Sequence, residues 1–405
     1  MRFSGFDDEW KKSNLGNISS NEMYGMNSAA KDYDGFNKYI RITDISETSN
    51  KFIPNPLTSP DGDLEDKYKL KKGDIVFART GASTGKTYLY DDNDRNLYFA
   101  GFLIKFHIDN ADPKFIFYNT LKEEYLNWVS VMSVRSGQPG INSNEYKKLP
   151  IILPSLDEQN KISNFLTSID KKIDLLERKH QFYQEFKKYL MQQIFTQKLR
   201  FADDENWVTV TIANIFDNIT DYVAAGSFAD IRKNVTYLKD PDYAQLIRTA
   251  DLKSNFTNGD FVYVDKHAFE YLWRVNLDEP CIVLPNIGNI GEVYYINPKE
   301  LPYSNNALAP NAILLKSNDN IKFKYYLLES PYFKNQLDII NEAGGRGKFN
   351  KTNLKKIKIK VPNNDLEKEK IAKCLSNVDN KLKLFNIQLI EMQEFKKGLL
   401  QQMFV

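Results

Sequence analysis

The chain contains two stretches in which apolar residues recur mostly every third or fourth position, with polar residues between them. This spacing places the apolar side chains along one stripe of a long amphipathic helix, as in helices that pack against one another. The first stripe comprises Ile162, Leu166, Ile169, Ile173, Leu176, Tyr183, Phe186, Leu190 and Ile194. The second comprises Ile371, Leu375, Val378, Leu382, Phe385, Met392, Phe395, Leu399 and Met403. The pattern therefore predicts two long helices.

The two stripes belong to an internal repeat that extends over the whole chain. The pattern Glu-Phe-Lys-Lys-x-Leu-x-Gln-Gln-x-Phe occurs at 185–195 and again at 394–404. The segments before the helices also match, for example Ile-Arg-Ile-Thr-Asp-Ile at 40–45 and Ile-Arg-Thr-Ala-Asp-Leu at 247–252. A repeat of this size indicates one architectural unit used twice. Since framework residues match and loop residues differ, the two copies should present two different surfaces.

Short apolar runs separated by turn residues fill 1–153 and 200–361, which we expect to be two globular domains. Each should be followed by a helical segment, 154–199 and 362–405 respectively. The dipeptide Arg-Phe near the N-terminus also follows the first helix, so the chain begins about where its C-terminus stops. We therefore expect an α+β protein, with two pseudo-repeated α/β domains separated by two long antiparallel coiled-coil-like helices.

Composition is that of a folded protein with a nearly balanced charge. Hydrophobic residues make up 42% of the chain and aromatic residues 13%, which is enough to bury two sizeable cores. The formal net charge is only +2, so any nucleic-acid binding must depend on local basic faces.

The two cysteines, Cys281 and Cys374, form neither a disulfide framework nor a zinc motif. Both are expected to be small core residues of a protein in a reducing compartment. The sequence shows no signal peptide and no stretch of about 18 apolar residues that could cross a membrane. We therefore expect a soluble, cytoplasmic protein.

Several segments, in the right order and spacing, resemble the specificity subunit of type I restriction–modification systems. They are the helix ends at 190–201 and 399–404, the helix start at 153–162, and the segments 73–81 and 222–229. The resemblance covers essentially the whole chain. It departs from the family pattern at 361–371, where the second helix start is one residue longer and lacks the usual Glu-Gln pair.

This resemblance implies a function for each segment. The regions 1–153 and 200–361 would be target-recognition domains, each reading one half of a bipartite double-stranded DNA target. The helices would set the spacer between the halves and dock two methyltransferase (modification) subunits, and through them restriction/translocase subunits. The chain itself would be non-catalytic and bind no cofactor, while the partner subunits would use S-adenosylmethionine, ATP and Mg.

In the first globular domain, two loops carry side chains suited to DNA contact. Arginine can bind guanine in bidentate fashion, amide side chains can bind adenine, and hydroxyl or lysine groups can bind phosphates. The candidates are Arg79, Thr80, Ser83, Thr84 and Lys86 in one loop, and Gln138, Asn142 and Asn144 in the other.

In the second domain, the loop that corresponds to 136–144 is more basic, and the loop that corresponds to 79–87 carries asparagines. The candidates are Lys348, Lys351, Arg346, Asn350, Asn286 and Asn289. Arg41 and Arg248 lie in the framework that both halves share, so each could form either a structural salt bridge or a phosphate contact.

Two other functions remain open. The loop 81–87 nearly matches a phosphate-binding loop, which would suit a P-loop-like nucleotide hydrolase using Lys86. It has three residues instead of four before Gly-Lys, and Thr80 occupies the glycine position that the motif needs. The second alternative is a coiled-coil adaptor without a nucleic-acid role. Neither a catalytic set nor metal-ligand spacing is evident, since the three histidines, His107, His180 and His267, are far apart.

Overall fold

The computed structural model describes residues 1–202, 206–288, 290–344 and 348–404. Its internal contacts divide the chain into two units. Unit 1 consists of Met1–Glu177 and Ile387–Val405, and unit 2 consists of Arg178–Asn386. Each unit therefore contains one globular domain together with part of each long helix.

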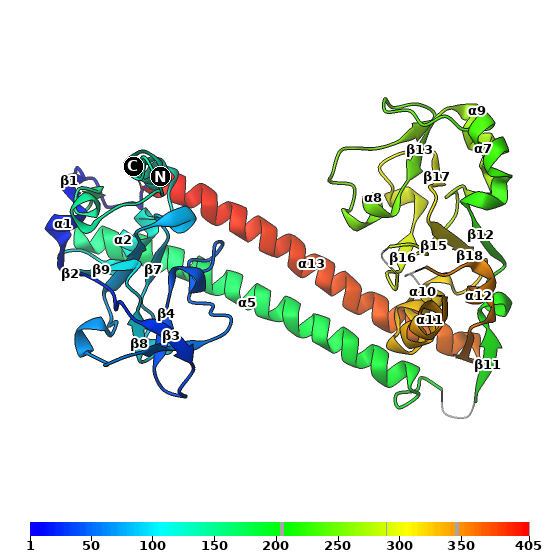
Figure 1. Ribbon diagram of the computed structural model, residues 1–405, viewed down its shortest axis with the longest axis horizontal. Coiled ribbons are helices and arrows are strands. Elements are labelled where there is room, and N and C mark those ends of the chain that lie inside the picture. The colour runs from blue at the N-terminus through cyan, green and yellow to red at the C-terminus, as the bar shows by residue number, and fades with distance from the viewer. Residues whose placement is uncertain (203–205, 289, 345–347, 405) are drawn as a thin grey trace. The chain divides into compact units, whose positions relative to one another are not determined.

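Unit 1 is built around a four-stranded antiparallel sheet in the order β2-β9-β6-β7, with three separate strand pairs beside it: β1-β10, β3-β5 and the parallel pair β4-β8. The strands are β1 Lys11–Asn14, β2 Ser19–Tyr24, β3 Ala29–Asp32, β4 Lys38–Ile40, β5 Thr58–Asp61, β6 Asp74–Ala78, β7 Thr87–Leu89, β8 Leu97–Phe99, β9 Leu103–Ile108 and β10 Pro150–Leu153. Short helices connect them (Figure 1). They are α1 Leu15–Ile18, α2 Pro113–Asn119, α3 Glu123–Met132 and α4 Ser143–Tyr146.

Unit 2 has the same plan, with a four-stranded sheet in the order β12-β18-β15-β16, a three-stranded sheet β14-β13-β17 and the pair β11-β19. The strands are β11 Trp207–Thr211, β12 Asn218–Asp221, β13 Ala244–Ile247, β14 Tyr263–Val264, β15 Cys281–Pro285, β16 Tyr294–Ile296, β17 Asn306–Leu308, β18 Ala312–Lys316 and β19 Lys358–Pro362. The helices are α6 Ile212–Ile215, α7 Phe228–Asn234, α8 Thr249–Lys253, α9 Lys266–Tyr271, α10 Ile321–Glu329, α11 Pro331–Gly344 and α12 Lys351–Lys356.

The sequence repeat corresponds to a structural repeat at the level of strand pairing. In unit 1 the parallel pair runs from Lys38↔Leu97 to Ile40↔Phe99. In unit 2 the parallel pair runs from Gln245↔Asn306 to Ile247↔Leu308. The expectation of two pseudo-repeated α/β domains is therefore confirmed. Cys281 is fully buried in β15, and burial raises the pKa of its thiol to about 12, as suits a core residue.

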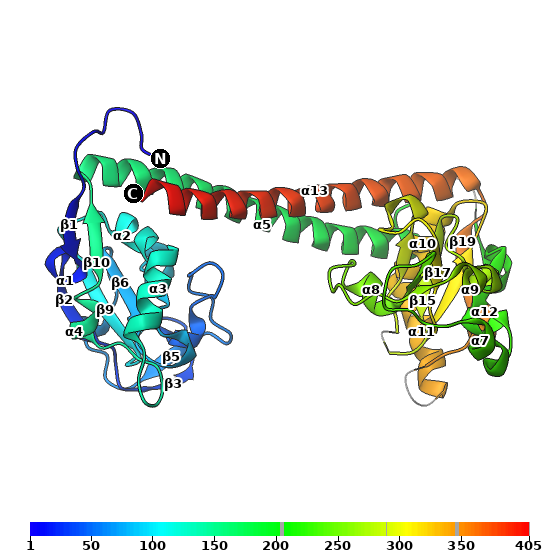
Figure 2. The same cartoon turned by 90° about the horizontal axis from the view of Figure 1, so that it is seen from above.

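The two long helices are α5 (Leu156–Phe195) and α13 (Asp365–Met403). Within unit 1 the first part of α5 lies beside the end of α13, and within unit 2 the last part of α5 lies beside the start of α13 (Figures 1 and 2). The pairing is therefore antiparallel in each unit. One core in unit 1 contains Leu166 of α5, Leu399 of α13 and Phe115 of the globular domain. Each stripe thus packs against the other helix and against a domain at once.

One part of the expected stripe is wrong. Phe186 and Phe395 were placed on the packed face, but their side chains are 37% and 53% exposed. An α-helix has about 3.6 residues per turn, so a stripe with nearly heptad spacing drifts around the helix and carries some members out of the contact. At both positions the following lysine, Lys187 or Lys396, is the more buried of the two, at 19% exposure.

An arginine forms a bidentate salt bridge with a glutamate near the start of each long helix. Arg2 Nε and Nη2 donate to the two carboxylate oxygens of Glu158 at 2.9 and 2.7 Å. Arg200 Nε and Nη2 donate to those of Glu367 at 2.8 and 3.0 Å. Glu367 therefore takes the place of Glu158. The second helix start thus keeps a glutamate in this role, although it is one residue longer and has Lys368 after the glutamate where the first has Gln159.

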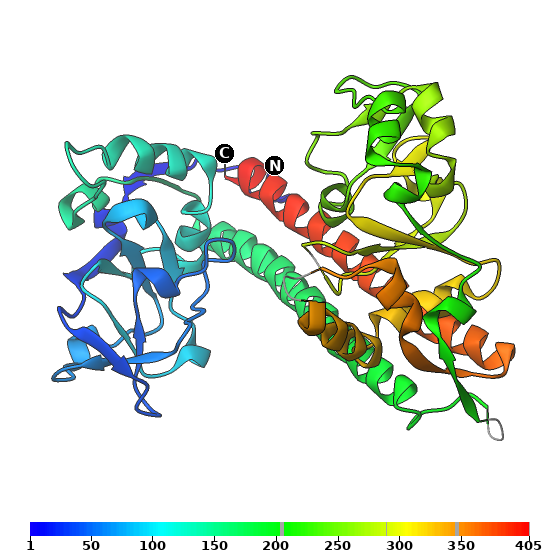
Figure 3. The same cartoon turned by 45° about the vertical axis from the view of Figure 1, so that its right-hand side comes forward.

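The N-terminus lies beside the end of α13 within unit 1 (Figure 3). The N-terminal ammonium group donates a hydrogen bond to the backbone carbonyl of Gln402, near the end of α13. Among the described residues, no helix is both long enough and apolar enough to span a membrane.

Candidate nucleic-acid interface

In unit 1 the fold brings together the two loops that the sequence singled out. The first loop leaves the central strand β6, and the second precedes α4. Gly81 N donates to Pro139 O at 3.0 Å, and Ile141 N donates to Arg79 O at 2.9 Å. These backbone bonds hold 79–87 and 136–144 against each other.

Arg79 is a cationic group of the first loop whose position is fixed by several contacts. Its Nε donates to the Gly101 carbonyl at 3.0 Å, and its guanidinium carbon lies 5.0 Å from the ring centre of Tyr24 and 5.8 Å from that of Phe102. Both rings are exposed. Among the described residues, neither Nη atom has a hydrogen-bond or ion-pair partner. The outer edge of the guanidinium is therefore free while its position is fixed.

Tyr24 and Phe102 were missed by sequence reasoning. They lie at the end of β2 and just before β9, far from Arg79 in sequence. Only the pairing of β2 and β6 on either side of β9 brings them to the same place. Nothing in their local sequence spacing indicates this arrangement.

The remaining candidates in unit 1 differ in how free their side chains are. Gln138 and Asn144 are exposed, and Ser83 and Thr80 are half-buried. Thr84 Oγ1 donates to the Gly81 carbonyl at 2.7 Å. Asn142 caps α4, since its Oδ1 accepts from Glu145 N at 3.0 Å. Loop geometry therefore already uses Thr84 and Asn142.

The structure does not support the nucleotide-hydrolase alternative. Lys86 Nζ donates to the Ile45 carbonyl at 3.2 Å and forms an ion pair with Glu47. The chain then enters strand β7, whereas a phosphate-binding loop needs a helix N-terminus there. Gly85 has φ +91°, and a Cβ on it would lie 2.6 Å from the Val129 side chain, so a tight turn accounts for this glycine.

Unit 2 presents different chemistry on the same framework. Asn286 occupies the place of Arg79, since Arg79 directly follows β6 and Asn286 directly follows β15. In each unit the backbone N–H of this residue donates to the residue before the neighbouring strand. Arg79 N donates to Phe102 O at 3.0 Å, and Asn286 N donates to Asn311 O at 3.1 Å. Asn286 Nδ2 donates to the Phe349 carbonyl at 3.2 Å. Lys348 is exposed, and Asn289 and Arg346 lie outside the described residues.

The residue before α12 caps its helix in the same way as the residue before α4. Asn350 Oδ1 accepts from Asn353 N at 2.8 Å and caps the helix, as Asn142 does in unit 1. Lys351 Nζ lies 2.8 Å from Asp221 Oδ1 in β12. At the corresponding place in unit 1, Ser143 N donates to the Tyr24 hydroxyl at 3.2 Å. Lys351 thus serves at least as a tether between its loop and the sheet.

Arg41 and Arg248 both form the structural salt bridge that was one of their two predicted roles. Arg41 Nε and Nη2 donate to Asp44 at 2.9 and 2.8 Å, and Arg248 Nε and Nη2 donate to Asp251 at 3.1 and 2.8 Å. The two aspartates are buried. A phosphate contact by either arginine stays a prediction.

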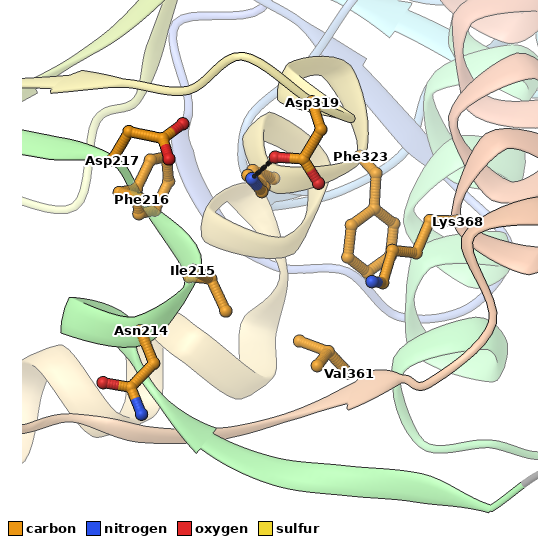
Figure 4. A pocket seen from close by; sticks show the side chains of 9 residues that line it. Asn214, Ile215, Phe216, Asp217, Asp319, Phe323, Val361 and Lys368 are labelled. Atoms are coloured by element: carbon orange, nitrogen blue, oxygen red, sulfur yellow. Dashed lines mark hydrogen bonds and ion pairs between the residues drawn. The ribbon is translucent and has the colours of Figure 1, made fainter.

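A pocket of about 180 Å³ lies in unit 2 beside the start of α13 (Figure 4). It is lined by Asn214, Ile215, Phe216, Asp217, Asp319, Phe323, Lys324, Val361 and Lys368. Asp319 lies 2.6 Å from Lys324, whose hydrogen bond lowers the pKa of that carboxyl, and Lys368 lies 2.8 Å from Asp365. These charges are already neutralised by protein partners, so we assign no ligand to the pocket. The described residues also contain no group of three or more metal-ligating side chains.

The family is shown by a match to the model described as "Type I restriction modification DNA specificity domain" over residues 7–181 and 204–392. These two segments cover most of the chain, so it belongs to this family and contains the domain twice. It is thus a specificity subunit, a class that forms the non-catalytic subunits of such systems. The resemblance stated from the sequence is confirmed.

Individual relatives agree with this family. The chain is 23% identical over 356 residues to the putative type I restriction enzyme MjaX specificity subunit of Methanocaldococcus jannaschii, covering 82% of this chain and 78% of that one. It is 28% identical over 173 residues to the type I restriction enzyme HindI specificity subunit of Haemophilus influenzae, covering 41% of this chain and 36% of that one.

Solved structures support the fold. The crystal structure of the type I restriction–modification S subunit from M. genitalium matches with a TM-score of 0.60 at 16% identity, covering 100% of this chain and 97% of that one. A second chain, from a structure that describes complex assembly and conformational transition of the type I system, matches with a TM-score of 0.54 at 15% identity, over 98% of each chain.

The salt bridge at Arg248 predicts a loss of stability that does not depend on DNA. Replacing Arg248 by alanine leaves the buried carboxylate of Asp251 without its partner, so the free energy of unfolding should fall by about 1–2 kcal/mol. Urea unfolding of the chain alone measures this. The control is Lys253→Ala on the same helix, where an exposed ion pair is lost and the change should stay below about 0.5 kcal/mol. Equal effects of the two variants would contradict the structural role of Arg248.

Proposed function

We propose that this specificity subunit reads a bipartite double-stranded DNA target, with the domain of unit 1 reading one half and that of unit 2 the other. The observation that carries this proposal is the exchange of Arg79 for Asn286 at the same place on a shared framework. The outer edge of the Arg79 guanidinium can bind guanine, whereas the Asn286 amide donates to the Phe349 carbonyl and its oxygen is buried, so the same scaffold offers different groups to DNA in the two units. Family membership indicates that the ligand is DNA, and the different loops account for different sequences in the two half-sites.

In unit 1 the reading edge consists of Arg79 with Tyr24 and Phe102 beside it, and of Gln138 and Asn144 on the neighbouring loop. A guanidinium held by a backbone carbonyl and two rings loses little freedom when it binds, which favours a specific contact. Thr80, Ser83 and Lys86 then contribute, on this proposal, to positioning on the phosphate backbone.

The helix pair is proposed to set the spacer and to dock two methyltransferase subunits. Exposed apolar side chains on long polar helices favour protein contact. They are Leu175, Ile387, Ile390 and Phe395 in unit 1, and Phe182, Phe186, Tyr189 and Leu384 in unit 2. Leu175 matches Leu384 in the repeat, and Phe186 matches Phe395, so two similar surfaces would bind two copies of one partner.

Catalysis is assigned to those partners. On this proposal the chain itself holds no cofactor, while the methyltransferase subunits use S-adenosylmethionine and the restriction/translocase subunits, which join through them, use ATP and Mg. A coiled-coil adaptor without a nucleic-acid role is the competing function, and it predicts that DNA sequence has no effect on binding by the assembled complex.

Replacing Arg79 by glutamine should weaken discrimination at one base pair of a single half-site. A bidentate contact to guanine contributes about 1–3 kcal/mol, which corresponds to a roughly five- to 150-fold loss of preference at that position. Methylation of a DNA library by the complex assembled with the variant chain measures this preference.

Arg95→Gln is the matched control, because Arg95 is an exposed arginine of the same domain that has no ion pair among the described residues. It should leave every base preference unchanged. If Arg79→Gln altered both half-sites, or if it altered neither, the assignment of the reading edge to unit 1 would be wrong.

Replacing both Phe186 and Phe395 by serine should weaken methyltransferase docking without unfolding the chain. Loss of an apolar anchor at an interface costs about 1–3 kcal/mol, so co-purification of the methyltransferase should fall by about tenfold or more. Phe36→Ser is the control, since Phe36 is similarly exposed but lies in the globular domain. Full assembly by the double variant would contradict this docking surface.

A further inference from the structure

Three side chains from three different elements meet in unit 1. The Tyr118 hydroxyl of α2 donates to Asp170 Oδ2 of α5 at 2.6 Å. Lys396 Nζ of α13 lies 2.6 Å from Asp170 Oδ1, and 5.7 Å from the ring centre of Tyr118. Thr167 Oγ1, one turn before Asp170, also lies 3.3 Å from the Tyr118 hydroxyl. The globular domain, the helix that follows it and the other long helix are thus joined at one point.

The same arrangement occurs in unit 2 with the roles of the two long helices exchanged. The Tyr326 hydroxyl of α10 donates to Asp379 Oδ2 of α13 at 2.6 Å, and Ser376 Oγ lies 3.3 Å away. Lys187 Nζ of α5 lies 2.9 Å from Asp379 Oδ1 and 5.5 Å from the ring centre of Tyr326. Lys187 also lies 3.1 Å from Glu329 Oε2. We call the two sets the Tyr–Asp–Lys triads.

The chemistry of the triads favours one arrangement of hydrogen bonds. Both tyrosines are buried. Burial, followed by interaction with the neighbouring aspartate, raises the pKa of Tyr118 and of Tyr326, so each phenol stays protonated and donates. Burial lowers the pKa of Lys187, but Glu329 and Asp379 outweigh it and the pKa is raised, so this ammonium group stays charged.

Apolar packing alone defines the position of a domain along a helix poorly. Successive turns of α5 and α13 offer similar leucine and isoleucine side chains, so a shift by one turn would exchange one apolar contact for another. A shift would, however, leave the buried tyrosine hydroxyl and a partly buried ion pair without partners, which is costly. Buried polar residues fix the register of coiled coils for the same reason.

We propose that the two Tyr–Asp–Lys triads are positioning residues that fix the register and orientation of each recognition domain on the helix pair, and that they thereby determine how strictly the spacer length is enforced. This inference rests on the proposed function. It explains why the first lysine of the repeated Glu-Phe-Lys-Lys pattern is present in both helices. Lys396 of α13 contacts the triad of the first domain, and Lys187 of α5 contacts the triad of the second domain.

The test uses the full chain assembled with its methyltransferase subunits. The variants are Lys396→Met, which keeps an unbranched side chain one atom shorter and removes its charge, and Tyr118→Phe, which removes only the hydroxyl. Methylation is measured on two DNA libraries, one with spacers one base pair shorter and longer than the preferred length, and one with varied half-site bases at the preferred spacer. The preference for the correct spacer should fall by about tenfold in Lys396→Met, while base preferences in both half-sites stay unchanged.

The matched control is Lys397→Met, since Lys397 is the next lysine of the same pattern and is exposed without a hydrogen bond or ion pair among the described residues. It should keep the spacer preference of the unaltered chain. The second unit provides an independent repetition, with Lys187→Met compared with Lys188→Met.

Two results would overturn the inference. The first is an unchanged spacer preference in active Lys396→Met and Tyr118→Phe complexes, and the second is a change of base preference equal to the change of spacer preference. Tyr118→Phe decides the matter if Lys396→Met fails to fold, because its substitution is nearly isosteric. If the unaltered chain directs methylation to no bipartite sequence at all, the proposed function itself fails, which this design detects separately.

Discussion

The structure depends on a packing constraint that links distant parts of the chain. The core of unit 1 contains Leu166 from α5 and Leu399 from α13, so the N-terminal domain is completed by residues near the end of α13. The core of unit 2 likewise contains Leu190 from α5 and Leu375 from α13. Unit 2 is one contiguous segment, but the core of unit 1 requires two segments that are distant in sequence. In both units the core includes side chains from both long helices, so the apolar stripes must pack against each other. This constraint explains why the repeat includes the helices.

Duplication around such a helix pair gives one framework with two independent surfaces. The parallel strand pairs, the central sheets, the arginine–glutamate bonds at the helix starts and the Tyr–Asp–Lys triads recur in both units. The loops that leave the framework do not recur in sequence: Arg79 and Ser143 are replaced by Asn286 and Lys351. In such a chain, the loops of one domain can change while the sheets and helices that position both domains stay the same.

Periodicity and the internal repeat predicted the fold class and both long helices, because these features depend on many residues at regular spacing. The family came instead from the resemblance of several segments to known specificity subunits. The same reasoning missed the side of the helix on which Phe186 and Phe395 lie, since a few degrees of drift per turn decide exposure. It also missed Tyr24 and Phe102 beside Arg79, which only strand pairing brings together. The lysines of the triads belong to a pattern visible in the sequence, the repeated Glu-Phe-Lys-Lys. Their tyrosine and aspartate partners could be identified only in the folded chain.

The central claim is that the helix pair sets the distance between the two half-sites. Its most direct test is to insert one seven-residue repeat into both helices, between Glu177 and Arg178 and between Asn386 and Ile387, where the two units meet along the chain. A heptad lengthens each helix by about 10 Å and nearly preserves its stripe. Since DNA rises about 3.4 Å per base pair, the methylated target should keep both half-sequences and gain about three base pairs of spacer. An unchanged spacer in an active complex would contradict the account.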